Sequence, residues 1–216
     1  MARAQADSLV AVRSGKVDLE GALELPESPV GVVLFAHGSG SSRHSARNLF
    51  VAHKLREARL GTLLIDLLTA DEDAVHDMRF DIALLSDRLA DAARFLAREA
   101  RTAKLPLGLF GASTGAAAAL RVAAEPSPAV GAVVSRGGRP DLAGSAVLCQ
   151  VQAPTLLIVG GHDYGVIELN EKAFAELSCV KELAIVPGAT HLFEERGALD
   201  EVARLAAGWF SRYLGG

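Results

Sequence analysis

Near the start of the chain, hydrophobic and polar residues alternate, whereas further along the hydrophobic residues form unbroken runs. Segments 8–13 and 16–25 alternate around Ser14 and Gly15, a pattern that predicts two short antiparallel strands joined as a hairpin at a sheet edge. Unbroken runs are typical of strands in a parallel sheet whose two faces are both covered. Such strands are predicted at 30–36, 62–66, 105–110, 130–135, 155–159 and 181–186.

Between these runs, hydrophobic residues recur at the three-and-four spacing of amphipathic helices. The clearest case is the series Leu85, Leu89, Ala92 and Leu96. Helices are predicted at 45–59, 79–101, 114–124, 168–177 and 199–214. Strand and helix therefore alternate, which predicts an α/β fold with a doubly wound, mainly parallel sheet, helices on both faces and the antiparallel hairpin at the N-terminus. We expect one domain over residues 1–216, with the edge hairpin in 1–27 and the core in 28–216.

Composition and charge narrow the function classes. The formal net charge is −4 and no basic block is present, which argues against a nucleic-acid partner. No apolar run approaches the roughly 20 residues of a membrane span, and residues 1–7 lack the apolar segment of a signal peptide. The two cysteines are too few for a disulfide framework. These features predict a cytoplasmic location, no membrane partner and a monomer or homodimer.

The segment GASTG at 111–115 carries the clearest chemical signal. It lies between the predicted strand 105–110 and the predicted helix 114–124. Strand, G-x-S-x-G and helix together indicate a nucleophile elbow, in which a tight turn exposes the serine hydroxyl at a helix N-terminus. Ser113 is therefore the candidate nucleophile. The alternative is a glycine-rich turn between a strand and a helix without chemistry.

Two further candidates follow other predicted strands. Asp163 comes after the strand at 155–159, and His191 comes after the strand at 181–186. Because side chains at the carboxyl ends of parallel strands meet at one sheet edge, we expect both to lie near Ser113. The chain order of nucleophile, acid and base is that of an α/β-hydrolase, with His191 as base and Asp163 as its carboxylate partner. Alternatively, Asp163 is a turn residue and His191 caps the last helix.

A glycine-rich loop, HGSG at 37–40, directly follows the strand at 30–36. Loops of this kind supply one backbone N–H of an oxyanion hole, and the residue after the nucleophile supplies the other. We predict Thr114 as one donor. For the other donor Gly38, Ser39 and Gly40 are candidates, of which we favour Ser39. His37 is expected to support the loop through hydrogen bonds.

A few other residues are candidates for substrate binding. Arg136 follows a predicted strand and Arg43 follows the HGSG loop, so both are expected at the same cleft, with Gly38 and Gly40 beside them. Guanidinium groups there would hold an anionic part of a substrate. The alternative for Arg136 is an ion pair with Asp141 or a nearby carboxylate that holds the loop. Asp66 also follows a strand, as a reserve acid or a brace for its loop.

Taken together, the HGSG, GASTG, GGHD (160–163) and PGATH (187–191) segments resemble the α/β-hydrolase superfamily, and in particular the compact dienelactone hydrolase family. This resemblance covers roughly residues 28–214 and implies a catalytic core there that acts on a small-molecule ester without a cofactor. Dienelactone hydrolases use a cysteine nucleophile, whereas this elbow carries a serine, which favours a carboxylesterase-like activity. The run SRGGRPD at 135–141 resembles small hydrolases joined to phosphoribosyltransferase domains, although this sequence contains no such domain.

Several functions remain open beside a small-ester esterase. The same residues serve thioesterases and other C–O or C–C hydrolases, and an α/β-hydrolase scaffold also serves ligand sensing without catalysis. A phosphate loop is a weaker interpretation, because the glycines at 108, 111 and 115 lack the G-x-G-x-x-G spacing. The histidines show no zinc signature, so no metal site is predicted. Between residues 136 and 153 there is room only for a short helix near 141–148, which predicts a shallow, open pocket.

Overall fold

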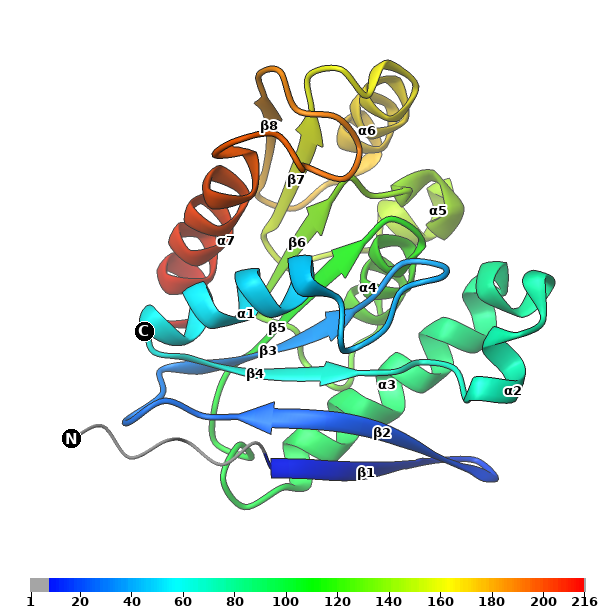
Figure 1. The fold of residues 1–216 in the computed structure, drawn as a ribbon, viewed down its shortest axis with the longest axis vertical. Coiled ribbons are helices and arrows are strands. Elements are labelled where there is room, and N and C mark those ends of the chain that lie inside the picture. The colour runs from blue at the N-terminus through cyan, green and yellow to red at the C-terminus, as the bar shows by residue number, and fades with distance from the viewer. Residues whose placement is uncertain (1–7, 216) are drawn as a thin grey trace.

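The computed structural model describes residues 8–215, and strands in this range form one eight-stranded sheet in the order β1-β2-β4-β3-β5-β6-β7-β8 (Figure 1). β1 pairs with β2 and β2 with β4 in the antiparallel sense, and all other neighbouring strands are parallel. The strands are β1 Ser8–Ser14, β2 Val17–Glu24, β3 Gly31–Ala36, β4 Leu60–Ile65, β5 Leu107–Ala112, β6 Ala132–Arg136, β7 Thr155–Gly160 and β8 Lys181–Val186. The predicted fold class is confirmed, including the antiparallel hairpin at the edge.

The unbroken hydrophobic runs of the sequence correspond to strands that are buried on both faces of the sheet. Every residue of β3, β4, β5, β6 and β7 is buried, because helices cover both faces of these central strands. In β8, the last strand of the sheet, only Val186 is buried. Burial on both faces removes the need for alternation, so these strands are read from the sequence as continuous apolar segments.

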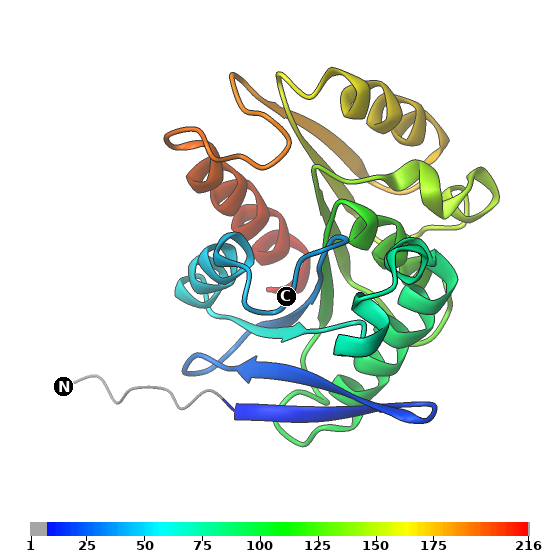
Figure 2. The ribbon, with the colours of Figure 1, turned by 45° about the vertical axis from the view of Figure 1, so that its right-hand side comes forward.

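Helices lie in two layers, one on each face of the sheet (Figures 1 and 2). α1 Ala46–Glu57 and α7 Ala198–Leu214 pack on one face, where their side chains join a core that includes Phe35, Phe110 and Val134. α3 Ile82–Arg98 and α4 Thr114–Ala124 pack on the other face, together with α5 Ser145–Leu148 and α6 Tyr164–Glu176. Shorter helical segments are α2 Ala70–Asp73, η1 His76–Phe80 and η2 Pro140–Ala143.

Some helix boundaries differ from the prediction. α3 begins at Ile82 and not at residue 79, because the Asp81 carboxylate accepts a hydrogen bond from the Leu84 N–H and caps the first turn. Residues 76–80 before it form a separate 3₁₀ turn. α6 begins at Tyr164, four residues before the predicted start at 168. The short helix α2 was not predicted; it is closed by a capping box between Thr69 and Glu72.

The expectations about membrane spans, a signal segment and the cysteines can be compared with the structure for residues 8–215. None of the helices within residues 8–215 is long and apolar enough to cross a membrane. The expectation about a signal segment concerns residues 1–7, which lie outside the described residues. Cys149 is exposed and Cys179 half-buried, and both are free thiols.

Candidate active site

Ser113 lies in the turn between β5 and α4, with φ 50° and ψ −121°. A positive φ is unfavourable for a residue with a side chain, and it persists only where the surrounding structure holds it. The two glycines of the motif allow the close packing that does so. A Cβ at Gly111 would lie 2.4 Å from the Ala116 Cα, and one at Gly115 would lie 2.2 Å from the Ala36 carbonyl oxygen. The segment therefore has the strained geometry of a nucleophile elbow.

This packing also accounts for the glycines that raised the question of a phosphate loop. A Cβ at Gly108 would lie 2.7 Å from the Phe210 ring, so this position is small because α7 crosses it. The glycines at 111 and 115 are required by backbone contacts with α4 and β3. All three positions are thus explained by close approach of neighbouring elements, without a phosphate ligand.

Asp163 and His191 are joined by a hydrogen bond between His191 Nδ1 and Asp163 Oδ2 at 2.6 Å. Because a carboxylate can only accept, Nδ1 carries the proton and donates it to the bond. A neutral His191 then has its free lone pair on Nε2. The carboxylate is mostly buried, whereas 40% of the His191 side chain is exposed, so the ring remains accessible from the surface. This pair has the arrangement of a catalytic base and its carboxylate partner.

Of the two alternatives, the turn is present: the Asp163 N–H donates to the Gly160 carbonyl oxygen at 3.0 Å, while the side chain remains free to bind His191. Asp163 stands at the N-cap position of α6 but makes no capping hydrogen bond with its side chain, which instead accepts from His191. The N-cap residue of α7 is Gly197, not His191. Each of the two side chains therefore has a role in the pair and not in a helix cap.

The backbone at the end of β6 brings the nucleophile and the base to one place. Ser113 N–H donates to the Arg136 carbonyl oxygen at 3.3 Å, and the next residue, Gly137, has a φ of 49°. A Cβ at Gly137 would lie 3.4 Å from His191 Nδ1. Ser113 and the His191 ring therefore border the same dipeptide, so the residues predicted from three separate strands are gathered at one edge of the sheet.

The HGSG loop lies directly against the nucleophile. A Cβ at Gly38 would lie 2.9 Å from the Ser113 Cβ, so glycine is needed at this contact. Ser39 N–H donates to Thr114 Oγ1 at 3.0 Å, which places the two predicted oxyanion donors side by side. Gly40 has a φ of 68°, a backbone conformation that glycine adopts without strain.

His37 supports this loop, as predicted. The Leu67 N–H donates to His37 Nε2 at 3.0 Å, which makes Nε2 the acceptor and leaves the ring proton on Nδ1. Nδ1 in turn lies 3.0 Å from the Gly38 carbonyl oxygen and donates to it. Both ring nitrogens of this buried histidine are therefore used to hold the loop, and neither is available as a base.

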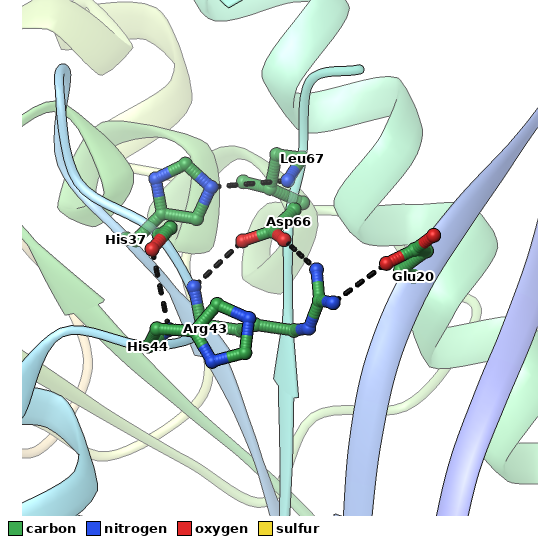
Figure 3. A network of polar contacts seen from close by, with 7 residues as sticks. Glu20, His37, Arg43, His44, Asp66 and Leu67 are labelled. Carbon is green, nitrogen blue, oxygen red and sulfur yellow. Dashed lines mark hydrogen bonds and ion pairs between the residues drawn. The ribbon is translucent and has the colours of Figure 1, made fainter. Parts of the chain in front are cut away.

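Arg43 is engaged in an ion-pair network (Figure 3). Its Nη1 donates to Asp66 Oδ2, and Nη2 donates to Glu20 Oε2 at 2.6 Å. The Arg43 backbone N–H also donates to Asp66 Oδ1 at 2.6 Å. Two carboxylates thus occupy this guanidinium group, and Asp66 acts as a brace for the loop that begins at His37. A cavity of about 310 Å³ borders the same network.

The surroundings of Arg136 differ from those of Arg43. It is 8% exposed, and its Nε and Nη1 atoms are buried without a hydrogen-bond partner. Burial, with a smaller contribution from the nearby charge of Arg47, lowers the pKa of Arg136 to about 10. The ion pair considered for Arg136 is made instead by Arg139, which binds both oxygens of Asp141 at 2.9 and 2.7 Å.

Several side chains around the site were not identified from the sequence. Arg47, in the first turn of α1, donates to Glu194 Oε1 at 2.9 Å and so links α1 to the loop that carries His191. Asn170 of α6 donates to the Gly138 carbonyl oxygen at 3.0 Å and holds the segment after β6. These contacts join residues that are more than 30 positions apart. A single sequence carries no signal for such pairings.

A cavity of about 480 Å³ lies beside the HGSG loop, and its lining includes Ser39, Gly40, Ser45 and Arg47. Its volume is in the range that holds a small organic molecule. Among the described residues, no group of three or more histidine, cysteine, aspartate or glutamate side chains is placed to hold a metal ion.

Comparison with known proteins finds close relatives, although no protein-family model matches the chain. A crystal structure of dienelactone hydrolase from Anabaena variabilis is 53% identical, with a TM-score of 0.94, over 97% of this chain and 99% of that one. Two proteins from strains of Mycobacterium tuberculosis, provisionally named phosphoribosyl transferases, are 56% identical over 210 residues. That match includes 97% of this chain but 47% of each relative, so the chain spans about half the length of these curated relatives.

More distant structures share the fold. Est1E from Butyrivibrio proteoclasticus has a TM-score of 0.82 at 12% identity, over 96% of this chain and 99% of that one. The esterase domain of a Rhodothermus marinus protein has a TM-score of 0.77 at 22% identity, over 96% and 99% of the two chains. At these identities the likeness shows the architecture alone.

Proposed function

Since the chain belongs to the dienelactone hydrolase family of α/β-hydrolases, we propose that it is a hydrolase that cleaves small carboxylic esters with Ser113, His191 and Asp163 as a catalytic triad. The observation that carries this proposal is the 2.6 Å bond between His191 and Asp163 at the sheet edge that bears the strained Ser113. An exposed imidazole held by a carboxylate near a serine in an elbow is the arrangement that activates a hydroxyl group.

In the first half of the reaction, Ser113 Oγ attacks the ester carbonyl carbon while His191 Nε2 takes the hydroxyl proton. The imidazolium that forms is stabilised by Asp163, which also keeps the ring oriented. Collapse of the tetrahedral intermediate breaks the bond to the alcohol oxygen, and Nε2 gives its proton to the departing alcohol. An acyl-enzyme on Ser113 remains.

In the second half, water attacks the acyl-enzyme and gives a proton to His191 Nε2. The carboxylic acid leaves, the proton returns to Ser113 Oγ, and the starting state is restored. Both tetrahedral intermediates carry an oxyanion, which the N–H groups of Thr114 and Ser39 bind in this proposal. One such donor typically contributes about 3 kcal/mol to transition-state stabilisation. Ser39 N–H leaves its bond to Thr114 Oγ1 when it turns to the oxyanion.

A small substrate is favoured by the region after β6. Between β6 and β7 the chain forms only η2 and the four-residue α5, so this segment places no long helical lid over Ser113. A cavity of about 480 Å³ borders the HGSG loop at Ser39 and Gly40, and its size suits a small organic group. Short esters should therefore be better substrates than palmitoyl esters. Thioesters remain the next class to assay, since the same residues act on them.

Phosphoribosyl transfer is not proposed for this chain. The relatives that carry this name match the chain over 47% of their length, so the name describes proteins about twice as long. The glycines around Ser113 that superficially suggest a phosphate loop are accounted for by contacts with Ala116, Ala36 and Phe210.

The proposal is tested by fluorophosphonate labelling, followed by mass spectrometry of the labelled peptide and by rates on 4-nitrophenyl acetate. We expect labelling at Ser113, none in Ser113→Ala, and a loss of roughly a hundredfold or more in kcat/KM for Asp163→Asn. Ser211→Ala, at an exposed position of α7, is the matched control and should keep the wild-type rate. A folded wild-type protein that neither labels nor hydrolyses the ester would indicate a ligand-binding scaffold instead.

A further inference from the structure

The strained backbone of Ser113 is held on both sides by the segment that follows β6. The Ser113 N–H donates to the Arg136 carbonyl oxygen at 3.3 Å, and the Ser113 carbonyl oxygen accepts from the Arg139 N–H at 3.0 Å. A residue with a side chain keeps a φ of 50° only where its surroundings fix it. The position of residues 136–139 therefore sets the position of the candidate nucleophile.

This segment contains two glycines, so its own backbone is weakly restrained. The Gly137 N–H donates to the Ile158 carbonyl oxygen of β7 at 2.8 Å. The Gly138 carbonyl oxygen accepts from Asn170 Nδ2 at 3.0 Å. Within the described residues, Asn170 thus supplies the side-chain hydrogen bond that fixes the backbone of residues 136–139.

Asn170 is an uncommon residue for the interior of a buried helix face. It is fully buried in α6, and its second amide hydrogen is donated to the Val166 carbonyl oxygen at 2.8 Å. Asparagine is a poor helix former, and burying its amide costs free energy unless the amide is hydrogen-bonded. Its Oδ1 is buried without a partner, so part of this cost is not offset. The two bonds of Nδ2 hold the amide facing Gly138.

The same helix begins at the carboxylate of the candidate site. Asp163 stands at the N-cap position of α6 and binds His191. Asn170 follows seven residues later, which is about two helical turns, so both residues lie on one side of the helix. One helix therefore holds the candidate base through Asp163 and the candidate nucleophile through Asn170.

We propose that Asn170 is a positioning residue for Ser113, which it holds in place relative to His191 through the backbone of Gly138 and Arg139. This inference rests on the proposed ester hydrolysis at Ser113. Without the bond to Gly138 the segment can shift, and a displacement of about 1 Å at the reacting group is enough to lower a rate about a hundredfold. The cavity beside the HGSG loop has neither Asn170 nor residues 136–139 in its lining, so ester binding should change little.

Two variants remove the bond and one control removes a similar bond elsewhere. Asn170→Leu deletes the amide and keeps a side chain of similar size. Asn170→Ser retains a hydroxyl that bonds to the Val166 carbonyl oxygen but is too short for Gly138, and it serves where the leucine variant does not fold. Thr102→Val is the matched control, because Thr102 is also buried and donates to the Leu96 carbonyl oxygen at 2.7 Å, in the loop before β5 at the opposite edge of the sheet.

The readout separates the rate of the chemical step from substrate binding. The burst of 4-nitrophenol from 4-nitrophenyl acetate gives the acylation rate constant at saturating ester and the half-saturating ester concentration. We expect the two Asn170 variants to acylate roughly 10- to 100-fold more slowly, with the half-saturating concentration changed by less than about threefold. Fluorophosphonate labelling of Ser113 should slow by a similar factor. Thr102→Val should lose melting temperature to a similar extent and keep the wild-type acylation rate.

Acylation at the wild-type rate in an Asn170 variant that folds would overturn the inference, and so would a higher half-saturating concentration without a slower step. A loss of rate in Thr102→Val equal to that in Asn170→Leu would also overturn it, because lowered stability would then be the cause. Wild type that neither labels nor hydrolyses the ester rejects the proposed function itself. Active wild type with unchanged Asn170 variants rejects the positioning role alone and retains the hydrolase.

Discussion

Replacing Arg136 by methionine should make the protein more stable, an unusual expectation for a buried residue beside the candidate nucleophile. Methionine keeps most of the length and flexibility of the side chain and removes the charge. In the native state this charge is buried near the like charge of Arg47 with Nε and Nη1 unpaired, whereas in the unfolded chain it is hydrated. Replacing a buried ionic group by an apolar residue of similar volume is often neutral or stabilising, because the desolvation penalty disappears.

The magnitude follows from the lowered pKa. The lowering of the Arg136 pKa from its ordinary value to about 10 means that keeping the group protonated costs about 3 kcal/mol more in the folded state than in the unfolded state. This cost is present at every pH below about 10 and fades as the pH rises above that value. Part of the gain is lost to imperfect packing of the methionine, so we expect the free energy of unfolding to rise by about 1–3 kcal/mol at pH 7.

Urea unfolding at pH 7 measures this change, with melting curves as a second readout. For a chain of this length each kcal/mol corresponds to roughly 2–4 °C in Tm. Arg139→Met is the control, because it removes a half-exposed arginine from an ion pair with Asp141 and should lower stability by about 0–1 kcal/mol. A loss of more than about 1 kcal/mol in Arg136→Met would refute the reasoning, since it would mean that the charge holds the fold together.

Three further predictions concern other parts of the molecule. Arg88 holds the pKa of Glu72 at about 2, so this pair stabilises the protein above pH 4.5 and progressively less as the pH falls toward 2; Glu72→Gln should therefore cost about 2 kcal/mol in urea unfolding at pH 7 and much less at pH 3. Gly115→Ala should abolish labelling of the elbow or prevent folding, because its Cβ would lie 2.2 Å from the Ala36 carbonyl oxygen; wild-type labelling in this variant contradicts that geometry. Chelators should leave 4-nitrophenyl acetate hydrolysis unchanged, and a rate lost to chelator and restored by metal would contradict a purely serine-based reaction.

The sequence predicts best those features that are set by residues close together in the chain. The central strands are recognised because both faces are buried, and the elbow because the glycines at 111 and 115 stand at fixed distances from Ser113. The contact between Asp163 and His191 was predictable for a related reason. Parallel strands end at one edge, so Asp163 and His191, each a few residues after a strand, had to lie near one another, as their 2.6 Å bond shows.

Helix ends and ion pairs were harder to predict. The start of α3 depends on one capping carboxylate, at Asp81, and the start of α6 includes Gly165 and an exposed Tyr164, which weaken the helical pattern. Ion pairs depend on contacts across the fold. Arg43 finds its two carboxylates on β2 and just after β4, which lie 23 positions away in opposite directions along the chain.

Arg43 and Arg136 show why a sequence cannot tell an arginine held in ion pairs from a buried arginine without one. Both follow a strand or its loop, and both were predicted to face the cleft. The fold gives Arg43 two carboxylates, which hold its loop against the sheet, and gives Arg136 none for Nε and Nη1. An arginine that only supports the structure is stabilised by its partners, and one without partners costs stability. The structure therefore separates two arginines that look alike in the sequence, because the desolvation cost of Arg136 is not offset by an ion pair of the kind that holds Arg43.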